Sequence, residues 1–150
     1  MSELDVMEAC SLCQVVMQCD YRGLLEDPRC LDWLTAELKT FPNNETIVYS
    51  IATILCNIVE SMCIVDSLLI EGSIVNPVVL ADLLANPLCK YTVGVLRSLI
   101  LLLMDRDVQI SPACIIGIVN GVKVLELTST TCLLALTLYY NLLSWYYPHC

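Results

Sequence analysis

Four cysteines near the start of the chain have the residue type and spacing that could bind a metal ion. Cys10 and Cys13 form a CxxC pair, and Cys19 and Cys30 follow it. Structural zinc sites need a closed tetrahedral set of soft ligands, and they usually repeat the CxxC pair. The sequence holds no second CxxC. We therefore expect no metal site, and no thioredoxin-like redox chemistry, which would need a βαβ context.

The single histidine, His149, could activate a nucleophile because it neighbours the thiol of Cys150. A Cys–His pair needs a frame that holds its geometry, and a solvated tail does not provide one. Phosphate-binding glycine motifs and serine nucleophile elbows do not occur in the sequence. We expect neither catalysis nor a bound cofactor.

The cysteines and the first residues favour an intracellular protein, cytoplasmic or nuclear. The start is acidic and lacks the charged and apolar regions of a signal peptide. Thiols of proteins that are not secreted stay reduced, and free cysteine packs as a small apolar residue. The ten cysteines are therefore expected to help fill the core.

The charge argues against direct binding of nucleic acid. The net charge is -9, and the seven Lys and Arg residues form no stripe that could neutralise phosphates. The acidic residues of the first third form either a solvated face or a docking surface for a basic peptide segment. These residues are Asp20, Glu26, Asp27, Asp32 and Glu37.

A helical membrane protein is the main alternative on composition, because 57% of the residues are hydrophobic. The stretch from Ile47 to Ile70 has the length of about 20 residues that a bilayer span needs. Asn57, Glu60 and Asp66 lie within it and would be costly in lipid. Flanking Lys and Arg are scarce. We therefore favour a protein outside the membrane.

Helix-start signals recur with a constant spacing along the chain. Each is a capping residue followed by an acidic, proline or hydroxyl-rich first turn. The capping residues are Ser2, Asn44, Asn86 and Thr128, each 42 residues after the one before. HEAT and armadillo repeats have periods of roughly 40–47 residues. The spacing predicts related copies within one domain over residues 1–150.

Apolar residues keep the same register inside each predicted copy. The four rows are Leu12, Ile54, Leu96, Leu138; Val16, Ile58, Ile100, Leu142; Met7, Tyr49, Tyr91, Leu133; and Met17, Val59, Leu101, Leu143. Such repeated apolar positions give a helix a wide buried face, so all four rows are expected in the core. Proline and glycine argue against central strands, and the sequence predicts an all-α fold.

Proline and glycine also predict shorter helices between the long ones. Their expected starts are Asp27–Pro28, Ser61 with an end at Gly72, Asn76–Pro77, and Ser111–Pro112 with a break at Gly117 and Gly121.

The segments around the second copy resemble one armadillo repeat. The stretch from Asn44 to Val59 is similar to the long third helix of that family, Cys63 to Gly72 to the first, and Ile74 to Pro87 to the second. The resemblance is closest over residues 42–105. It implies a short α-solenoid of about three to four repeats, whose third helices line a concave groove. It also implies a non-enzymatic adaptor or scaffold.

In that family an asparagine of the third helix binds the backbone of an extended peptide, and Asn57 and Asn141 match its position. Thr53 and Thr137 stand where peptide-binding members place a tryptophan, which weakens the case for binding a nuclear-localisation signal. An extended or basic peptide segment remains the expected ligand. The alternative is that the two amides are buried and cap a neighbouring loop.

The last predicted helix, Cys132 to Tyr147, is apolar around most of its circumference. A solenoid exposes apolar surface at its ends unless polar repeats cover it. We therefore expect an interface with a second copy or with another subunit. Its predicted binding residues are Leu138, Leu142, Trp145 and Tyr146. An independent helical bundle that serves as a subunit of a larger complex is the remaining alternative.

Overall fold

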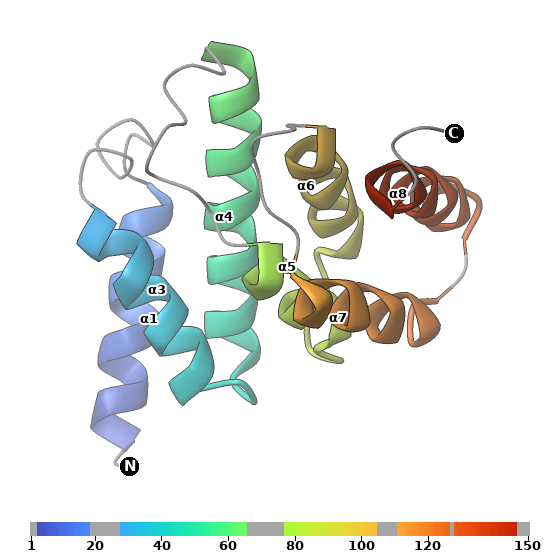
Figure 1. The fold of residues 1–150 in the computed structure, drawn as a ribbon. Coiled ribbons are helices and arrows are strands. Elements are labelled where there is room, and N and C mark those ends of the chain that lie inside the picture. Colours follow the sequence, from blue (N-terminus) through green and yellow to red (C-terminus); the bar gives the residue numbers. More distant parts are fainter. Residues whose placement is uncertain (1–2, 19–27, 66–76, 105–110, 127, 147–150) are drawn as a thin grey trace. The chain divides into compact units, whose positions relative to one another are not determined.

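The computed structural model describes residues 3–18, 28–65, 77–104, 111–126 and 128–146, and all regular structure in these ranges is helical (Figure 1). The helices are α1 (Glu3–Met17), α3 (Pro28–Thr40), α4 (Glu45–Val65), α5 (Pro77–Ala85), α6 (Thr92–Met104), α7 (Pro112–Lys123) and α8 (Ser129–Tyr146). The all-α prediction is confirmed for this part of the chain.

The chain divides into two compact units. Unit 1 is Met1–Val75 with Leu88–Lys90, and unit 2 is Asn76–Pro87 with Tyr91–Cys150. The single domain expected over residues 1–150 stays a prediction.

In unit 1, the central helix is α4, and both α1 and α3 pack against it (Figure 1). Its buried side chains recur at spacings of three and four, as expected for a helix with one apolar face. Those without exposed surface include Ile47, Ile51, Ile54 and Ile58. From the other two helices, Cys13 and Leu34 are also fully buried.

Asn44 begins α4, as the sequence predicts. Its side-chain Oδ1 accepts a hydrogen bond from the Ile47 N–H at 3.1 Å, and its carbonyl accepts one from the Val48 N–H at 3.0 Å. The thiol of Cys10 on α1 donates to the same Oδ1 at 3.7 Å. One side chain therefore both caps α4 and connects it to α1.

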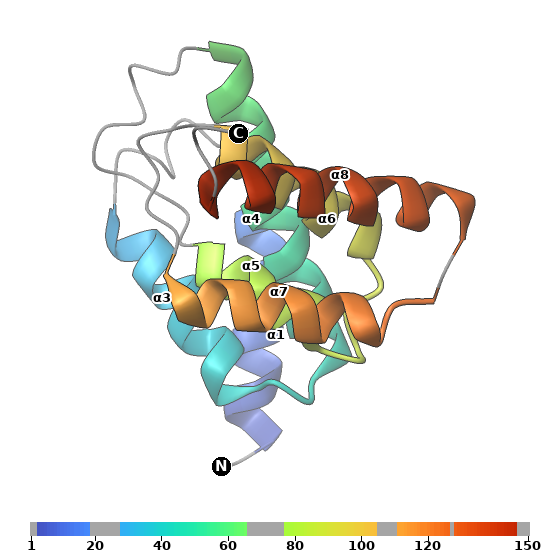
Figure 2. The same ribbon diagram turned by 45° about the vertical axis from the view of Figure 1, so that its right-hand side comes forward.

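In unit 2, α5 packs against α6 and α7, and α6 packs against α8 (Figure 2). The expected break in α7 at Gly117 and Gly121 was wrong, because the helix is continuous over Pro112–Lys123. The glycines instead allow close packing: a Cβ at 117 would lie 3.0 Å from the Ala81 Cβ, and one at 121 would lie 2.8 Å from the Leu84 Cγ. Small residues four apart let two helices approach closely.

The constant spacing of helix starts is not kept throughout the chain. Thr128 caps α8, since its Oγ1 accepts from the Thr131 N–H at 3.1 Å. Asn86 begins no helix, and the prediction for it was wrong. Its N–H donates to the Leu83 carbonyl at 3.1 Å, so Asn86 closes α5, and α6 begins at Thr92. Ser2, the first predicted cap, lies outside the described residues.

The predicted helix starts at Pro28, Pro77 and Pro112 are confirmed. A separate helix starting at Ser61 was wrong, because α4 runs without a break to Val65. No proline or glycine interrupts it there. The rest of that prediction lies outside the described residues, as does the end of the stretch Ile47 to Ile70 that was weighed as a membrane span. Among the helices that the structure describes, none has the length and apolar character to cross a membrane.

The apolar rows are buried only in part. The rows through Leu138 and Leu142 are buried in α4, α6 and α8, whereas Leu12 of the first row is exposed. The row through Met7, Tyr49 and Leu133 is exposed at these three positions, against prediction. Two positions five residues apart on a helix differ by about 140° in direction. Leu133 therefore cannot share the buried face of Leu138.

Candidate protein-binding surfaces

The C-terminal helix α8 buries one apolar stripe in unit 2. Ala135, Leu138 and Leu142 are 5%, 0% and 6% exposed, and they follow one another at spacings of three and four. The helix that packs against α8 is α6, so this stripe belongs to the core between the two helices. Leu138 and Leu142, which the sequence suggested as partner-binding residues, are thus core residues in this fold.

A second apolar stripe lies on the opposite side of α8 and is exposed. The outer stripe consists of Leu133, Leu136, Tyr140 and Leu143, which are 66%, 62%, 74% and 57% exposed. Residues two apart on a helix differ by about 200°, so Leu136 and Tyr140 point away from the buried Leu138. The spacing of three, four and three is the pattern with which helices pair in coiled coils.

Three polar side chains of α8 donate hydrogen bonds to backbone carbonyls of the same helix. The Thr137 Oγ1 donates to the Leu133 carbonyl at 2.9 Å, and the Asn141 Nδ2 donates to the Thr137 carbonyl at 2.9 Å. The Ser144 Oγ donates to the Asn141 carbonyl at 3.1 Å. Between Ser129 and Tyr146 the helix has no charged residue. Its exposed surface is therefore uncharged, and it combines the outer stripe with polar residues such as Thr137.

The other residues of α8 that the sequence suggested for partner binding are Asn141, Trp145 and Tyr146. Asn141 is half-buried and donates within its own helix, so part of its amide is already engaged. Trp145 and Tyr146 are helical in backbone, but their side chains lie outside the described part of the structure. Sequence reasoning placed Leu133 and Leu143 in buried rows and missed the outer stripe. The spacing of three and four from Leu133 onward was the signal that could have found it.

Asn57 is half-buried on α4 and takes part in an interaction. It belongs to unit 1, whereas Asn141 belongs to unit 2. Peptide binding by these two asparagines stays a prediction.

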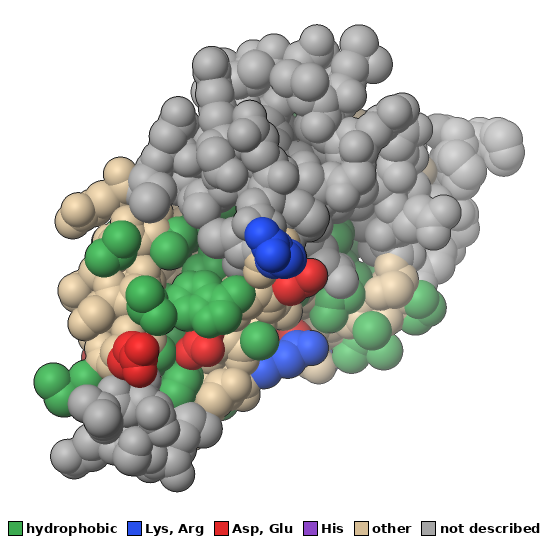
Figure 3. Space-filling view, turned by 90° about the vertical axis from the view of Figure 1, so that its left-hand side faces the viewer, with side chains coloured by type: hydrophobic (Ala, Val, Ile, Leu, Met, Phe, Trp, Pro, Cys, Tyr) green, Lys and Arg blue, Asp and Glu red, His purple; other side chains and the backbone are tan. Residues whose placement is uncertain are grey.

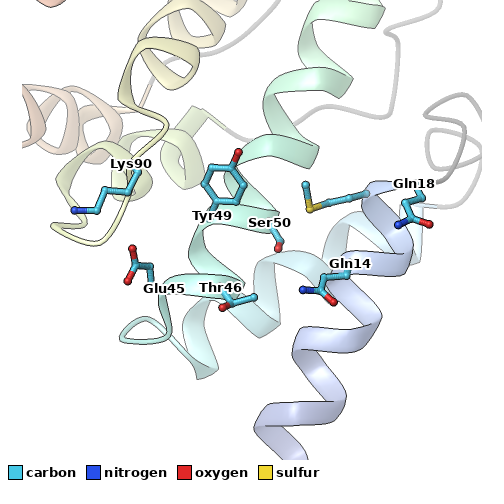
Figure 4. A pocket seen from close by; sticks show the side chains of 8 residues that line it. Gln14, Gln18, Glu45, Thr46, Tyr49, Ser50 and Lys90 are labelled. Carbon is cyan, nitrogen blue, oxygen red and sulfur yellow. The ribbon is translucent and has the colours of Figure 1, made fainter.

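A groove in unit 1 lies between α1 and α4 and has a volume of about 610 Å³ (Figure 4). Its lining residues are Gln14, Met17, Gln18, Glu45, Thr46, Tyr49, Ser50 and Lys90. The side-chain amides and hydroxyls can hydrogen-bond a polar ligand. The lining includes no cysteine or histidine, hence no thiol or imidazole for catalysis. Glu45 and Lys90 carry opposite charges, so the groove has no clear preference for the charge of a ligand.

A second groove in unit 1 lies between α1 and α3 and has a volume of about 340 Å³. The α1–α3 groove is lined by Glu8, Ala9, Leu12, Trp33, Glu37, Thr40 and Phe41. Figure 3 shows apolar side chains gathered on this side of the molecule, with acidic side chains beside them. Two carboxylates beside a tryptophan and a phenylalanine favour a cation with an apolar stem, such as a lysine or arginine side chain.

Two buried cysteines have the properties of core residues. The pKa of the Cys13 thiol is raised from 9.0 to about 11. Burial is the largest cause, followed by electrostatic interaction with Glu37 and then with Cys10. The pKa of the Cys114 thiol is also raised from 9.0 to about 11, mainly by burial and then by the charge of Asp82. Both thiols therefore stay protonated at neutral pH.

No group of three or more residues that could hold a metal ion occurs in the described part of the structure. Of the sequence candidates, Cys10 and Cys13 lie on α1, while Cys19 and the side chain of Cys30 are outside that part.

Comparison of the chain with protein-family models, curated proteins and solved structures finds no match. The likeness to armadillo repeats therefore rests on the residues alone.

Proposed function

We propose that this protein is a non-enzymatic adaptor that binds other protein chains, with the outer stripe of α8 as its main docking surface. The observation that carries this proposal is the exposure of Leu133, Leu136, Tyr140 and Leu143 on one side of an uncharged helix. Contiguous exposed apolar surface commonly marks an interaction site. The heptad-like spacing fits a partner that presents an apolar helix.

The α1–α3 groove is a second binding surface of the proposed adaptor. Its aromatic and acidic lining suits the basic peptide segment expected from the net charge of -9. The complementary charge would steer such a segment toward unit 1 and speed its association. An adaptor with these surfaces could hold a helix at α8 and a basic segment at the groove.

Of the armadillo-like arrangement, the proposal keeps only a relationship between α4 and α8. The caps at Asn44 and Thr128 support a common origin for α4 and α8. The different start of α6 speaks against a regular repeat between them. The adaptor role does not depend on this relationship, because it is argued from the outer stripe and the α1–α3 groove.

Site-specific photo-crosslinking in the native cell tests the proposed docking surface. Tyr140 is replaced by the photoreactive benzoylphenylalanine, and exposed Asn120 on α7 of the same unit is the matched control position. We expect covalent adducts with protein from position 140 and few from position 120. Adding Leu136→Glu should remove the adducts of position 140, since a charge at the outer stripe opposes apolar docking.

Equal adduct yields at positions 140 and 120, or yields that do not respond to Leu136→Glu, would show that the outer stripe is not a docking surface. Circular dichroism of each variant checks that α8 remains helical. The substitutions lie at exposed positions, so the core between α6 and α8 is retained.

A further inference from the structure

The outer stripe has the same spacing of side chains when α8 is followed in either direction. From the N-terminal end, the order is Leu133, Leu136, Tyr140, Leu143, with spacings of three, four and three. Reversing the helix keeps these spacings and exchanges only Leu136 with Tyr140. The midpoint falls at residue 138. A stripe with this symmetry can pair with a copy of itself that runs in the opposite direction.

We propose that α8 docks against the α8 of a second copy of this chain, antiparallel, with a two-fold axis beside residue 138. The inference rests on the proposed function and names its partner. Leu133 would face Leu143 of the other copy, and Leu136 would face Tyr140. The same patch then serves both molecules, as a two-fold symmetric interface requires.

Side-chain volume favours the antiparallel direction. In a parallel pair each residue meets its own equivalent, so Tyr140 would meet Tyr140 in one crowded layer while the other layers hold leucines. The antiparallel pair instead combines each tyrosine with Leu136 of the other copy. Layers of more even volume pack with fewer gaps and less overlap.

The absence of charge on α8 favours a second copy over a different partner. Copies of a chain with a net charge of -9 repel each other, and α8 offers an approach along a helix without charge. Paired helices usually choose partners through charged residues beside the apolar stripe. Here those flanking positions include Thr137 and Tyr139, which offer no charge for a different partner to recognise. Antiparallel helix dipoles also attract one another.

Sedimentation of the purified full chain in reducing buffer tests the self-association. We expect the wild type to dimerise in the micromolar range. Leu136→Glu and Tyr140→Glu should each weaken the dimer at least tenfold. Asn120→Glu adds the same charge to the exposed surface of α7 and should leave the dimer unchanged. Circular dichroism ensures that the variants retain their helical content.

Disulfide formation tests the direction of the pair. In the antiparallel arrangement, position 137 of one copy lies beside position 137 of the other, next to the two-fold axis. Thr137→Cys, in a background where the exposed Cys132 is changed to Ser, should give a 137–137 crosslinked peptide after mild oxidation. Thr130→Cys in the same background is the control. Its equivalents lie far apart along the helix axis in the antiparallel pair.

A chain that stays monomeric throughout the micromolar range would overturn this inference, as would a dimer that survives Leu136→Glu and Tyr140→Glu. Crosslinking at position 130 as efficient as at 137 would overturn the antiparallel direction. A monomer whose position 140 still crosslinks to another protein in the cell would leave the proposed function intact. A monomeric chain whose position 140 also gives no crosslink to protein in the cell would overturn the proposed function as well.

Discussion

Gly121 of α7 lies against Leu84 of α5 so closely that a Cβ on the glycine would come within 2.8 Å of the Leu84 Cγ. One turn earlier, Gly117 has the same relationship to Ala81, at 3.0 Å from its Cβ. Helix α7 therefore presents a strip of bare backbone to α5. The absence of two side chains allows the close approach of these helices.

Replacing Gly121 by a β-branched residue should loosen this contact. We expect Gly121→Val to lower the free energy of unfolding by about 1–3 kcal/mol, because the added carbons must displace Leu84. Urea denaturation followed by circular dichroism measures the change. Asn120→Val places the same side chain on the exposed face of α7 and serves as the control. Equal stability of the two variants would contradict the close packing.

The cap of α4 allows a comparison between adjacent asparagines. Asn44→Ala removes the acceptor for the Ile47 N–H and should destabilise the protein by about 1 kcal/mol. Asn43→Ala changes an exposed neighbour and should have little effect. Hydrogen exchange at the first turn of α4 locates the effect. If both variants exchange equally fast there, Asn44 does not act as the cap.

The raised pKa values of Cys13 and Cys114 predict how stability depends on pH. In the folded chain these thiols keep their protons up to a pKa of about 11, whereas the ordinary value is 9.0. Between these values the folded state binds more protons than the unfolded state, so stability should fall as the pH rises from 9.0 to about 11.

The measurement is the urea midpoint across this pH range, for the wild type and for Cys13→Ala and Cys114→Ala. Each substitution should reduce the slope, because it removes one titrating thiol. An unchanged slope in both variants would mean that other groups cause the dependence. At neutral pH, iodoacetamide should modify exposed Cys132 before either buried thiol.

The α1–α3 groove should bind basic peptides more strongly than the rest of the acidic surface. With a short oligolysine peptide as the probe, Glu37→Gln should weaken binding several-fold, since a partly exposed ion pair contributes up to about 1 kcal/mol. Glu126→Gln removes the same charge from an exposed position in unit 2. Trp33→Leu keeps the charge but removes the aromatic surface, and it should also weaken binding. Equal losses in Glu37→Gln and Glu126→Gln would show that only the net charge matters.

Several elements could be predicted because their signals are local. Pro28, Pro77 and Pro112 each begin a helix, since proline fits the first turn, where its missing N–H is not needed. Asn44 and Thr128 cap helices because their side chains reach the N–H groups of residues three positions on. Asn86–Pro87 has the same local signal. There, however, the N–H of Asn86 completes the end of α5, and a turn follows.

The sequence by itself determined that residues 129–146 form a helix, and that this helix is apolar on more than one side. It could not determine which side is buried, because the stripes through Leu138 and through Leu136 both have helical spacing and similar hydrophobicity. Only the packing of α6 against one of them decided that Leu138 lies in the core and Leu136 is exposed. Local sequence sets the direction in which each side chain leaves its own helix. The neighbour that covers it comes from a distant part of the chain and is chosen by the packing of the whole unit.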